Sequence, residues 1–248
     1  MVSLRWALAN SINWVTAYLM KQFPPEAVIA LTRRMGVTAP MEPVPSICLG
    51  SMDISVKEMT SAMATYANQG IHIEPVFVTR IEDKNGVILD EFTPQQEEAM
   101  SARTAYLMLD LMKGVVDEGS GRRVRWKYGL KMPVAGKTGT TQNHSDAWFM
   151  GITPTLATGV WVGGELRSIH FRSMRLGQGA NAALPVWAIY MRNIVQDSAV
   201  LHFPQEDFER PEELKNVDLD CNGMEQSPNL STPMQMEGPS HHDLNDLM

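Results

Sequence analysis

The sequence predicts an α+β fold in which helices cover an antiparallel sheet. Three apolar segments at hairpin spacing, residues 134–141, 146–152 and 156–162, predict consecutive antiparallel strands. Helical periodicity in the segments on both sides of these strands predicts helices that bury their apolar faces on the sheet. The 248 residues suffice for one domain with a tail.

Three helices are expected near the start of the chain. Segments 4–10 and 14–22 flank the tripeptide Ser11-Ile12-Asn13. Pro24-Pro25 ends the second segment, because proline cannot continue a helix. Residues 26–35 have the pattern of a third helix.

A fourth helix has a clear beginning. Ser55 and Glu58 have the spacing of a capping box, in which each side chain binds the other residue's backbone N–H. The apolar residues that follow share one helical face, and Gly70 marks the end. They are Val56, Met59, Met63 and Tyr66, so the methionines are expected in the core.

A hairpin and another helix precede the three strands. Residues 76–81 and 87–92 are joined by a turn with Asn85-Gly86, a strong hairpin signal. Ser101 is expected to cap a helix with one apolar face, formed by Ala105, Met108, Leu109, Met112 and Val116. We expect residues 119–121 to be a flexible link, followed by three arginines in a solvated turn, Arg122, Arg123 and Arg125.

The last predicted helix follows the strands. Pro185 is expected at its start, because proline suits the first helical position. The apolar residues that would pack on the sheet are Val186, Ile189, Tyr190 and Ile194. Residues 1–200 are therefore expected to form the domain.

The remaining residues, 201–248, form an acidic tail. They hold eleven acidic and two basic residues and five prolines, whereas the first 200 residues hold 19 basic and 17 acidic ones. Such a tail cannot bury enough apolar surface to offset the entropy of ordering it, so we expect it to be disordered. The nearly neutral domain also argues against nucleic acid as a partner.

No cofactor is expected. Cys48 and Cys221 are interpreted as two free thiols, and His241-His242 lack a third metal ligand nearby. No segment approaches the roughly 18 uninterrupted apolar residues of a membrane-spanning helix. Polar residues also interrupt the first 20 positions, which does not fit a signal peptide.

Residues 134–141 carry the strongest chemical signal. Lys137 supplies a compact cation, and the Thr138 and Thr140 hydroxyls can donate to the oxygens of one carboxylate. Gly139 lets a ligand backbone approach closely because it has no Cβ. The run predicts a site for an anionic carboxylate.

Lys-Thr-Gly is also one of three signatures of the penicillin-recognising serine enzymes, alongside S-x-x-K and S-x-N. The residues after it, 142–154 and 158–164, resemble the end of the transpeptidase domain of class A penicillin-binding proteins. The resemblance extends over roughly residues 4–195. It implies the fold of the β-lactamase-like superfamily, an antiparallel sheet covered by helices.

The tripeptide Ser11-Ile12-Asn13 resembles the S-x-N element of this family. No serine of the chain is followed by lysine three positions later, so S-x-x-K is absent. In the family, the S-x-x-K serine is the acylated nucleophile and precedes S-x-N. We therefore expect the nucleophile, its helix and the first strands to lie upstream, and the chain to be the C-terminal part of a larger enzyme.

The resemblance implies a D,D-transpeptidase that cross-links peptidoglycan. The upstream serine would attack a D-alanyl-D-alanine stem peptide, and an amine of a neighbouring stem would resolve the acyl-enzyme. Ser11 would relay a proton to the leaving nitrogen, and Asn13 would hold the substrate amide. Lys137, Thr138 and Thr140 would bind the terminal carboxylate, and the Thr140 N–H would form half of the oxyanion hole.

Two alternatives remain open from the sequence. A β-lactamase or D,D-carboxypeptidase shares these motifs but uses water as the acceptor, and a non-catalytic module would keep the binding site without a nucleophile. The partners implied by the resemblance are peptidoglycan stem peptides and β-lactams. It also implies a membrane anchor in the complete protein and a location on the extracytoplasmic (periplasmic) face of the bacterial inner membrane.

Overall fold

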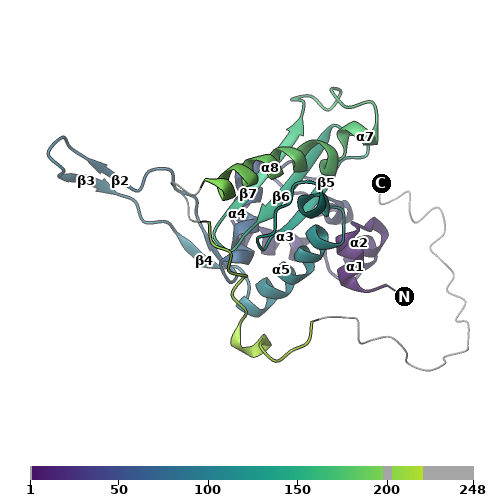
Figure 1. Cartoon of the computed structure of the whole chain (residues 1–248), viewed down its shortest axis with the longest axis horizontal. Helices are drawn as coiled ribbons and strands as arrows, with labels where there is room; N and C mark the ends of the chain where they lie inside the picture. Colours follow the sequence, from purple (N-terminus) through teal and green to yellow (C-terminus); the bar gives the residue numbers. More distant parts are fainter. Residues whose placement is uncertain (1, 198–202, 220–248) are drawn as a thin grey trace, which may run out of the picture.

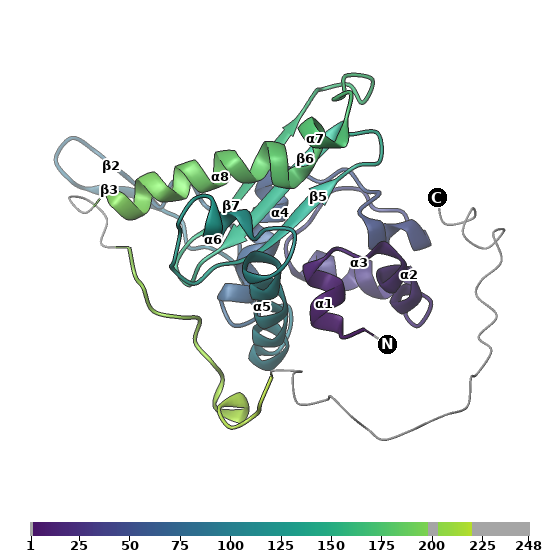
Figure 2. The ribbon, with the colours of Figure 1, turned by 45° about the vertical axis from the view of Figure 1, so that its right-hand side comes forward.

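A three-stranded antiparallel sheet forms the centre of the computed structural model, which describes residues 2–197 and 203–219. Its strands are β5 (Ala135–Thr140), β6 (Asp146–Ile152) and β7 (Ala157–Gly163), in the order β5-β6-β7. The three predicted strands are confirmed. β5 is an outer strand of this sheet, which leaves one edge open toward α1 and α2 (Figure 2).

Helices cover both faces of the sheet, as the α+β prediction requires. α8 (Gly179–Gln196) lies across one face, and α4 (Val56–Ala67) and α5 (Ala102–Asp117) lie on the other (Figure 2). Phe149 of β6 meets Trp187 of α8 edge-on, with ring centroids 5.0 Å apart. A Cβ on Gly151 would lie 2.3 Å from the Trp187 ring, so glycine is required for this close packing.

The prediction for α8 was wrong in two respects. The helix begins at Gly179, and Pro185 lies inside it. Of the four residues expected to pack on the sheet, Val186, Ile189 and Tyr190 are exposed, whereas Ile194 is half-buried against the core. The buried face consists of Ala180, Ala183, Leu184, Trp187, Ala188 and Met191. Small residues let this face approach the sheet, and alanine is the best helix former, so the helix extends to the N-terminal side of the proline.

The N-terminal helices agree with the prediction. They are α1 (Leu4–Ala9), α2 (Asn13–Met20) and α3 (Pro25–Arg34). Shorter helical segments are η1 (Pro45–Leu49) and α7 (Met174–Gly177).

The capping box at the start of α4 is confirmed. Ser55 Oγ accepts from the Glu58 N–H, and Glu58 Oε2 accepts from the Ser55 N–H, both at 3.2 Å. Hydrogen bonds from Ser55 and Thr38 lower the pKa of Glu58 to about 2. The deepest residues of α4 are the small ones, Ser61, Ala62 and Thr65, whereas the predicted apolar stripe is half-buried.

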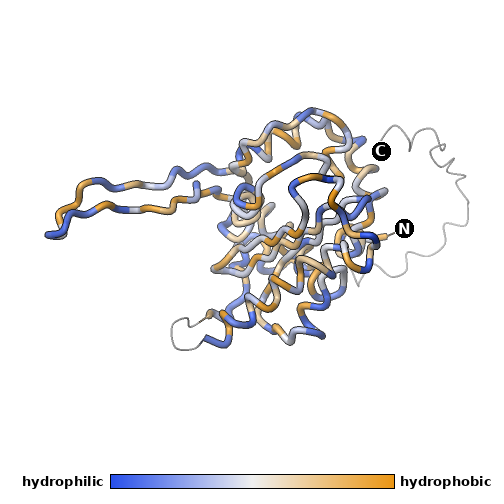
Figure 3. The backbone as a smooth tube through the Cα atoms, turned by 90° about the horizontal axis from the view of Figure 1, so that it is seen from above, coloured by the Kyte–Doolittle hydropathy of each residue, from blue (hydrophilic) through white to orange (hydrophobic). Residues whose placement is uncertain are grey.

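The predicted hairpin projects from the body as a long arm (Figures 1 and 3). Its strands, β2 (Arg80–Glu82) and β3 (Ile88–Glu91), are shorter than expected and have a bulge at Ile81/Glu82. At the base of the arm, β1 (Ile71–Ile73) pairs with β4 (Gln96–Glu98), which the sequence did not predict. Apolar and polar residues alternate in colour along the arm (Figure 3).

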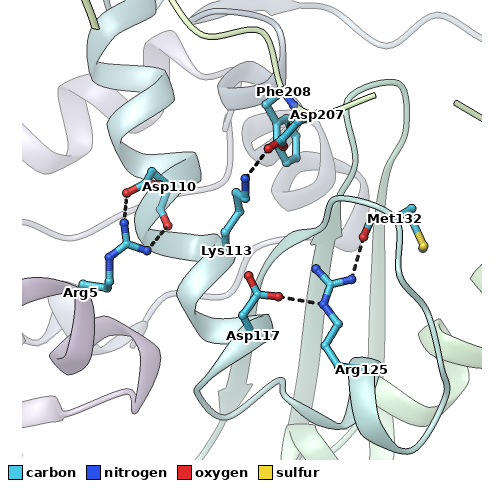
Figure 4. A network of polar contacts seen from close by, with 8 residues as sticks. All are labelled: Arg5, Asp110, Lys113, Asp117, Arg125, Met132, Asp207 and Phe208. Carbon is cyan, nitrogen blue, oxygen red and sulfur yellow. Dashed lines mark hydrogen bonds and ion pairs between the residues drawn. The ribbon is translucent and has the colours of Figure 1, made fainter. Parts of the chain in front are cut away.

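The turn after α5 is packed rather than flexible. A Cβ on Gly119 would lie 2.1 Å from the Ala9 carbonyl oxygen, and Gly121 is also buried. A short helix, α6 (Arg123–Trp126), follows. Arg125 donates to Asp117 at 2.8 Å and to the Met132 carbonyl at 2.7 Å (Figure 4). The expectation of a flexible link was wrong, because these glycines allow close backbone contact. The expectation of solvated arginines holds for Arg122, which is exposed, but was wrong for Arg123 and Arg125, which are half-buried and donate to groups of the domain.

Residues 203–219 pack against the domain, contrary to the expectation of a disordered tail from residue 201. They include η2 (Glu212–Leu214), and both Phe208 and Leu214 are buried. Lys113 of α5 pairs with Asp207 at 2.6 Å (Figure 4). Residues 220–248, with Cys221 and His241-His242, lie outside the described residues.

Within the described residues, no helix is both long and apolar enough to cross a membrane. Nor does that part of the chain contain a group of three or more metal-binding side chains.

Candidate active site

Strand β5 presents its side chains on two faces. Thr138 and Thr140 pair with Phe149 and Ala147 of β6, so both point toward the face that α8 covers. Lys137 pairs with Met150 and points to the opposite face. The Lys-Thr-Gly-Thr run therefore offers polar groups on both sides of one open strand edge.

The backbone of β5 also presents hydrogen-bonding groups at this open edge. The Thr141 N–H donates to the Asp146 carbonyl at 3.1 Å. These two residues lie opposite each other, one position beyond the last β5–β6 pair, Thr140 with Ala147. In an antiparallel ladder, residues alternate between bonding the neighbour and pointing away from it. The N–H and C=O groups of Thr138 and Thr140 consequently point outward, where a ligand can reach them.

Ser11 lies in the turn between α1 and α2. Its φ of 55° is in the left-handed region, and the Ser11 and Ile12 N–H groups donate to the Leu8 and Ala7 carbonyls, which closes α1. Neither helix uses the Ser11 side chain as a cap: Ser3 caps α1, and α2 has no side-chain cap. The exposed Ser11 hydroxyl is thus available for another partner.

That partner is Lys137. Its Nζ donates to Ser11 Oγ at 2.8 Å and to the Thr138 carbonyl at 2.9 Å. The two predicted motifs, 126 positions apart, meet at this contact. Burial lowers the pKa of Lys137 to about 8. The ammonium is therefore protonated at neutral pH but holds its proton more weakly than an ordinary lysine, which suits a group that exchanges protons with a hydroxyl.

The remaining predicted residues lie on the two elements that meet at this contact, α2 and β5. Asn13 is the exposed first residue of α2, two positions after Ser11. Gly139 faces Trp148, and a Cβ there would lie 3.0 Å from the Trp148 Cβ. Thr140 is exposed, and its Oγ1 accepts from the Gly179 N–H at 2.9 Å, which joins β5 to the start of α8.

Thr138 has a partner that sequence reasoning missed. Its Oγ1 lies 2.7 Å from Ser120 Oγ, and the Ser120 N–H donates to the Ala9 carbonyl at 2.9 Å. Ser120 thus contacts both β5 and the end of α1. The only sequence signal was the glycine on each side of it, which we interpreted as flexibility.

The turn between β5 and β6 is held by a separate network. Thr141 Oγ1 lies 3.0 Å from Ser145 Oγ, and Asp146 accepts from Ser145 Oγ at 2.7 Å and from Trp161 Nε1 at 2.9 Å. This network fixes the far end of β5 and does not contact Ser11 or Lys137.

Taken together, the serine–lysine contact at an open strand edge and the helix-covered sheet define a protein of the penicillin-recognising class. The sequence pattern of the penicillin-binding protein transpeptidase domain matches residues 1–168. The chain belongs to this family.

Relatives among characterised proteins agree. The chain is 36% identical over 212 residues to penicillin-binding protein 1A of Aquifex aeolicus, covering 86% of this chain and 28% of the relative. It is 33% identical over 188 residues to penicillin-binding protein 1B of Escherichia coli, covering 75% of this chain and 22% of the relative. The chain thus spans about a quarter of the length of these relatives.

Solved structures match the fold. Penicillin-binding protein 1A from Haemophilus influenzae has a TM-score of 0.73 at 21% identity, over 86% of this chain and 36% of that one. Penicillin-binding protein PonA1 from Mycobacterium tuberculosis has a TM-score of 0.71 at 25% identity, over 84% of this chain and 58% of that one. The expected fold class is confirmed.

Proposed function

We propose that this chain is the C-terminal part of the transpeptidase domain of a longer class A penicillin-binding protein, which cross-links peptidoglycan by D,D-transpeptidation. The observation that carries the proposal is the 2.8 Å contact between Lys137 Nζ and Ser11 Oγ. It joins the S-x-N and Lys-Thr-Gly motifs of the family in one site beside an open strand edge.

The acylated serine is assigned to a segment that precedes residue 1, because no serine here is followed by lysine three positions later. That serine attacks the penultimate carbonyl of the stem peptide, and the terminal D-alanine leaves. A serine hydroxyl needs a nearby base for this step.

The residues of this chain handle the proton and the carboxylate. Lys137 donates to Ser11 Oγ, so Ser11 can give its own proton to the leaving nitrogen and be reprotonated from Lys137. Asn13 holds the substrate amide. Thr138 and Thr140 bind the terminal carboxylate at the edge of β5, with Lys137 as the nearby positive charge. The outward Thr140 N–H is one donor of the oxyanion hole.

Peptidoglycan stem peptides are the proposed substrates, and β-lactams are the proposed inhibitors, since they acylate the same serine. A membrane anchor and a location on the extracytoplasmic face of the inner membrane follow for the complete protein. The support for both is the family to which the chain belongs.

Labelling with a fluorescent penicillin tests the proposal. The complete protein should give a covalent band that survives denaturing electrophoresis, whereas residues 1–248 alone should give none. A labelled band from residues 1–248 would place the nucleophile inside this chain. An unlabelled complete protein would favour a non-catalytic module, and hydrolysis of the stem peptide without cross-linking would favour a carboxypeptidase.

A further inference from the structure

We propose that Ser120 is a positioning residue, which orients the Thr138 hydroxyl toward the carboxylate of the ligand. This inference rests on the proposed function. It starts from the hydrogen bond of 2.7 Å between Ser120 Oγ and Thr138 Oγ1, two hydroxyls that each have a single proton.

The proton count decides what Thr138 can do. If Thr138 donates to Ser120, it has no proton left for a ligand and would present only lone pairs to an anion. If Ser120 donates to Thr138, the Thr138 proton is free for the carboxylate. An anion at the edge of β5 favours the second arrangement, in which the two hydrogen bonds also polarise each other.

The surroundings hold Ser120 in place for this role. Its N–H donates to the Ala9 carbonyl at 2.9 Å. Gly119 packs so closely on the same carbonyl that a Cβ would lie 2.1 Å from the oxygen. The Gly121 N–H donates to the Val115 carbonyl at 2.9 Å. Backbone contacts on both sides therefore fix where the Ser120 hydroxyl points.

Thr138 itself is only 9% exposed, so little bulk water competes with Ser120 for its hydroxyl. Next to the pair lies an open hollow of about 310 Å³ between the end of α1, residues 118–123 and the start of α8. Ser120 and Arg122 both line it. The hollow gives an anionic group room beside Ser120, where Arg122 and Arg123 outnumber the single acidic lining residue, Glu118.

The end of α1 that Ser120 holds leads directly into Ser11. Ser120 consequently links the two parts of the site, the serine turn through Ala9 and strand β5 through Thr138. A purely structural link would affect all ligands equally. A positioning role affects only ligands that present a carboxylate.

This difference defines the test, made on the complete protein. Acylation rates are measured for a penicillin and for the same penicillin with its carboxylate methylated, in the parent and in Ser120→Ala. We expect the variant to acylate about tenfold more slowly with the free carboxylate, the effect of one hydrogen bond to a charged group. Acylation by the ester should stay within about twofold of the parent.

Two further variants of the same position keep the test decisive. Ser120→Thr retains the hydroxyl and should restore most of the preference for the free carboxylate. Ser120→Cys has nearly the same size but a weaker donor, and should fall between the parent and Ser120→Ala. It provides the measurement if Ser120→Ala does not fold.

Ser145→Ala is the matched control. It removes a similar hydroxyl pair, Thr141 with Ser145, at the far end of β5. It should leave the ratio of the two acylation rates unchanged, whatever it does to stability. Equal slowing of acid and ester in Ser120→Ala, or no slowing, would overturn the inference while the proposed function stands. A parent that penicillin does not label would overturn both.

Discussion

Strand β5 and the segment 203–219 are both held by the domain, but in different ways. β5 is bonded along its whole length to β6, and it is contacted by α5, the turn after α5, α8 and the Ser11 turn. The segment 203–219 rests on two buried apolar side chains, Phe208 and Leu214, and on surface contacts such as Lys113 with Asp207 (Figure 4).

The two regions differ in what their function requires: β5 must hold reacting groups in precise positions, whereas the segment 203–219 stabilises the domain. A site needs side chains held from several directions, because a small displacement changes donor geometry. A supporting segment needs only a few anchors, since its value lies in the apolar area it covers. Variants of the two regions should therefore affect activity and stability separately.

The largest effect is expected for Lys137→Ala in the complete protein. Acylation by penicillin should fall about a hundredfold, because the variant removes the cation that donates to Ser11. The free energy of unfolding should change little. Burial has already deprived the ammonium of water, so removing it does not remove a large net contribution to stability. Lys137→Arg should retain part of the activity, because it keeps the charge on a bulkier planar group.

Stopped-flow acylation and thermal unfolding of the same preparations measure these two quantities. An acylation rate in Lys137→Ala within about threefold of the parent, roughly 0.65 kcal/mol of barrier, would contradict the role of Lys137.

Phe208→Ala should have the opposite profile. Removing a buried phenylalanine should lower the free energy of unfolding by about 3 kcal/mol, while the acylation rate of the folded protein stays the same. Phe77→Ala is the control, since Phe77 is 86% exposed and its loss should change stability by less than about 0.5 kcal/mol.

Truncation of the complete protein tests whether the segment 203–219 stabilises the domain. Ending the chain at residue 219 keeps Phe208 and Leu214, whereas ending it at residue 202 removes both. If the shorter protein is as stable as the longer one in urea unfolding, the segment does not support the domain.

The smallest effect is a pH dependence. The folded pKa of Lys137 is about 8, so its charge is present below that pH and is lost above it. Acylation by an anionic penicillin should fall about fivefold between pH 8 and pH 9. Lys137→Arg should lack this decline, because arginine stays charged.

Stability should show the reverse sign. An unfolded lysine titrates near 10.5, so the unfolded chain binds more protons than the folded one between pH 8 and 10.5. The contribution of Lys137 to the free energy of unfolding therefore increases with pH in this window. A pH–rate profile that is identical in the parent and Lys137→Arg would show that Lys137 does not control the decline.

Much of the fold could be predicted where local signals agreed with packing. The capping box of α4 and the three strands combined apolar patterns with clear ends, and these elements lie where expected. For α8, a local rule about Pro185 competed with the packing of Trp187, and packing decided. The packing of segment 203–219 could not be predicted, because its two buried apolar residues, Phe208 and Leu214, do not belong to a helical or strand-like repeat of apolar residues.

The candidate site was predictable only as motifs. The sequence suggested Ser11, Asn13 and the run 137–140, but it could not show which face of the sheet Lys137 and Thr138 would each take, because that depends on the register of β5 with β6. Ser120 escaped notice because its role depends on the contact of Gly119 with Ala9, which lies far away in sequence.

The left-handed backbone of Ser11 restricts which residues can ever occupy that position. Glycine, asparagine and aspartate tolerate this conformation best, but none of them carries a hydroxyl. Threonine keeps the hydroxyl, yet its branched Cβ is poorly suited to positive φ. Serine is the one residue that satisfies both demands. We therefore expect position 11 to be serine in nearly all related sequences, even where the sequences of the neighbouring helices differ.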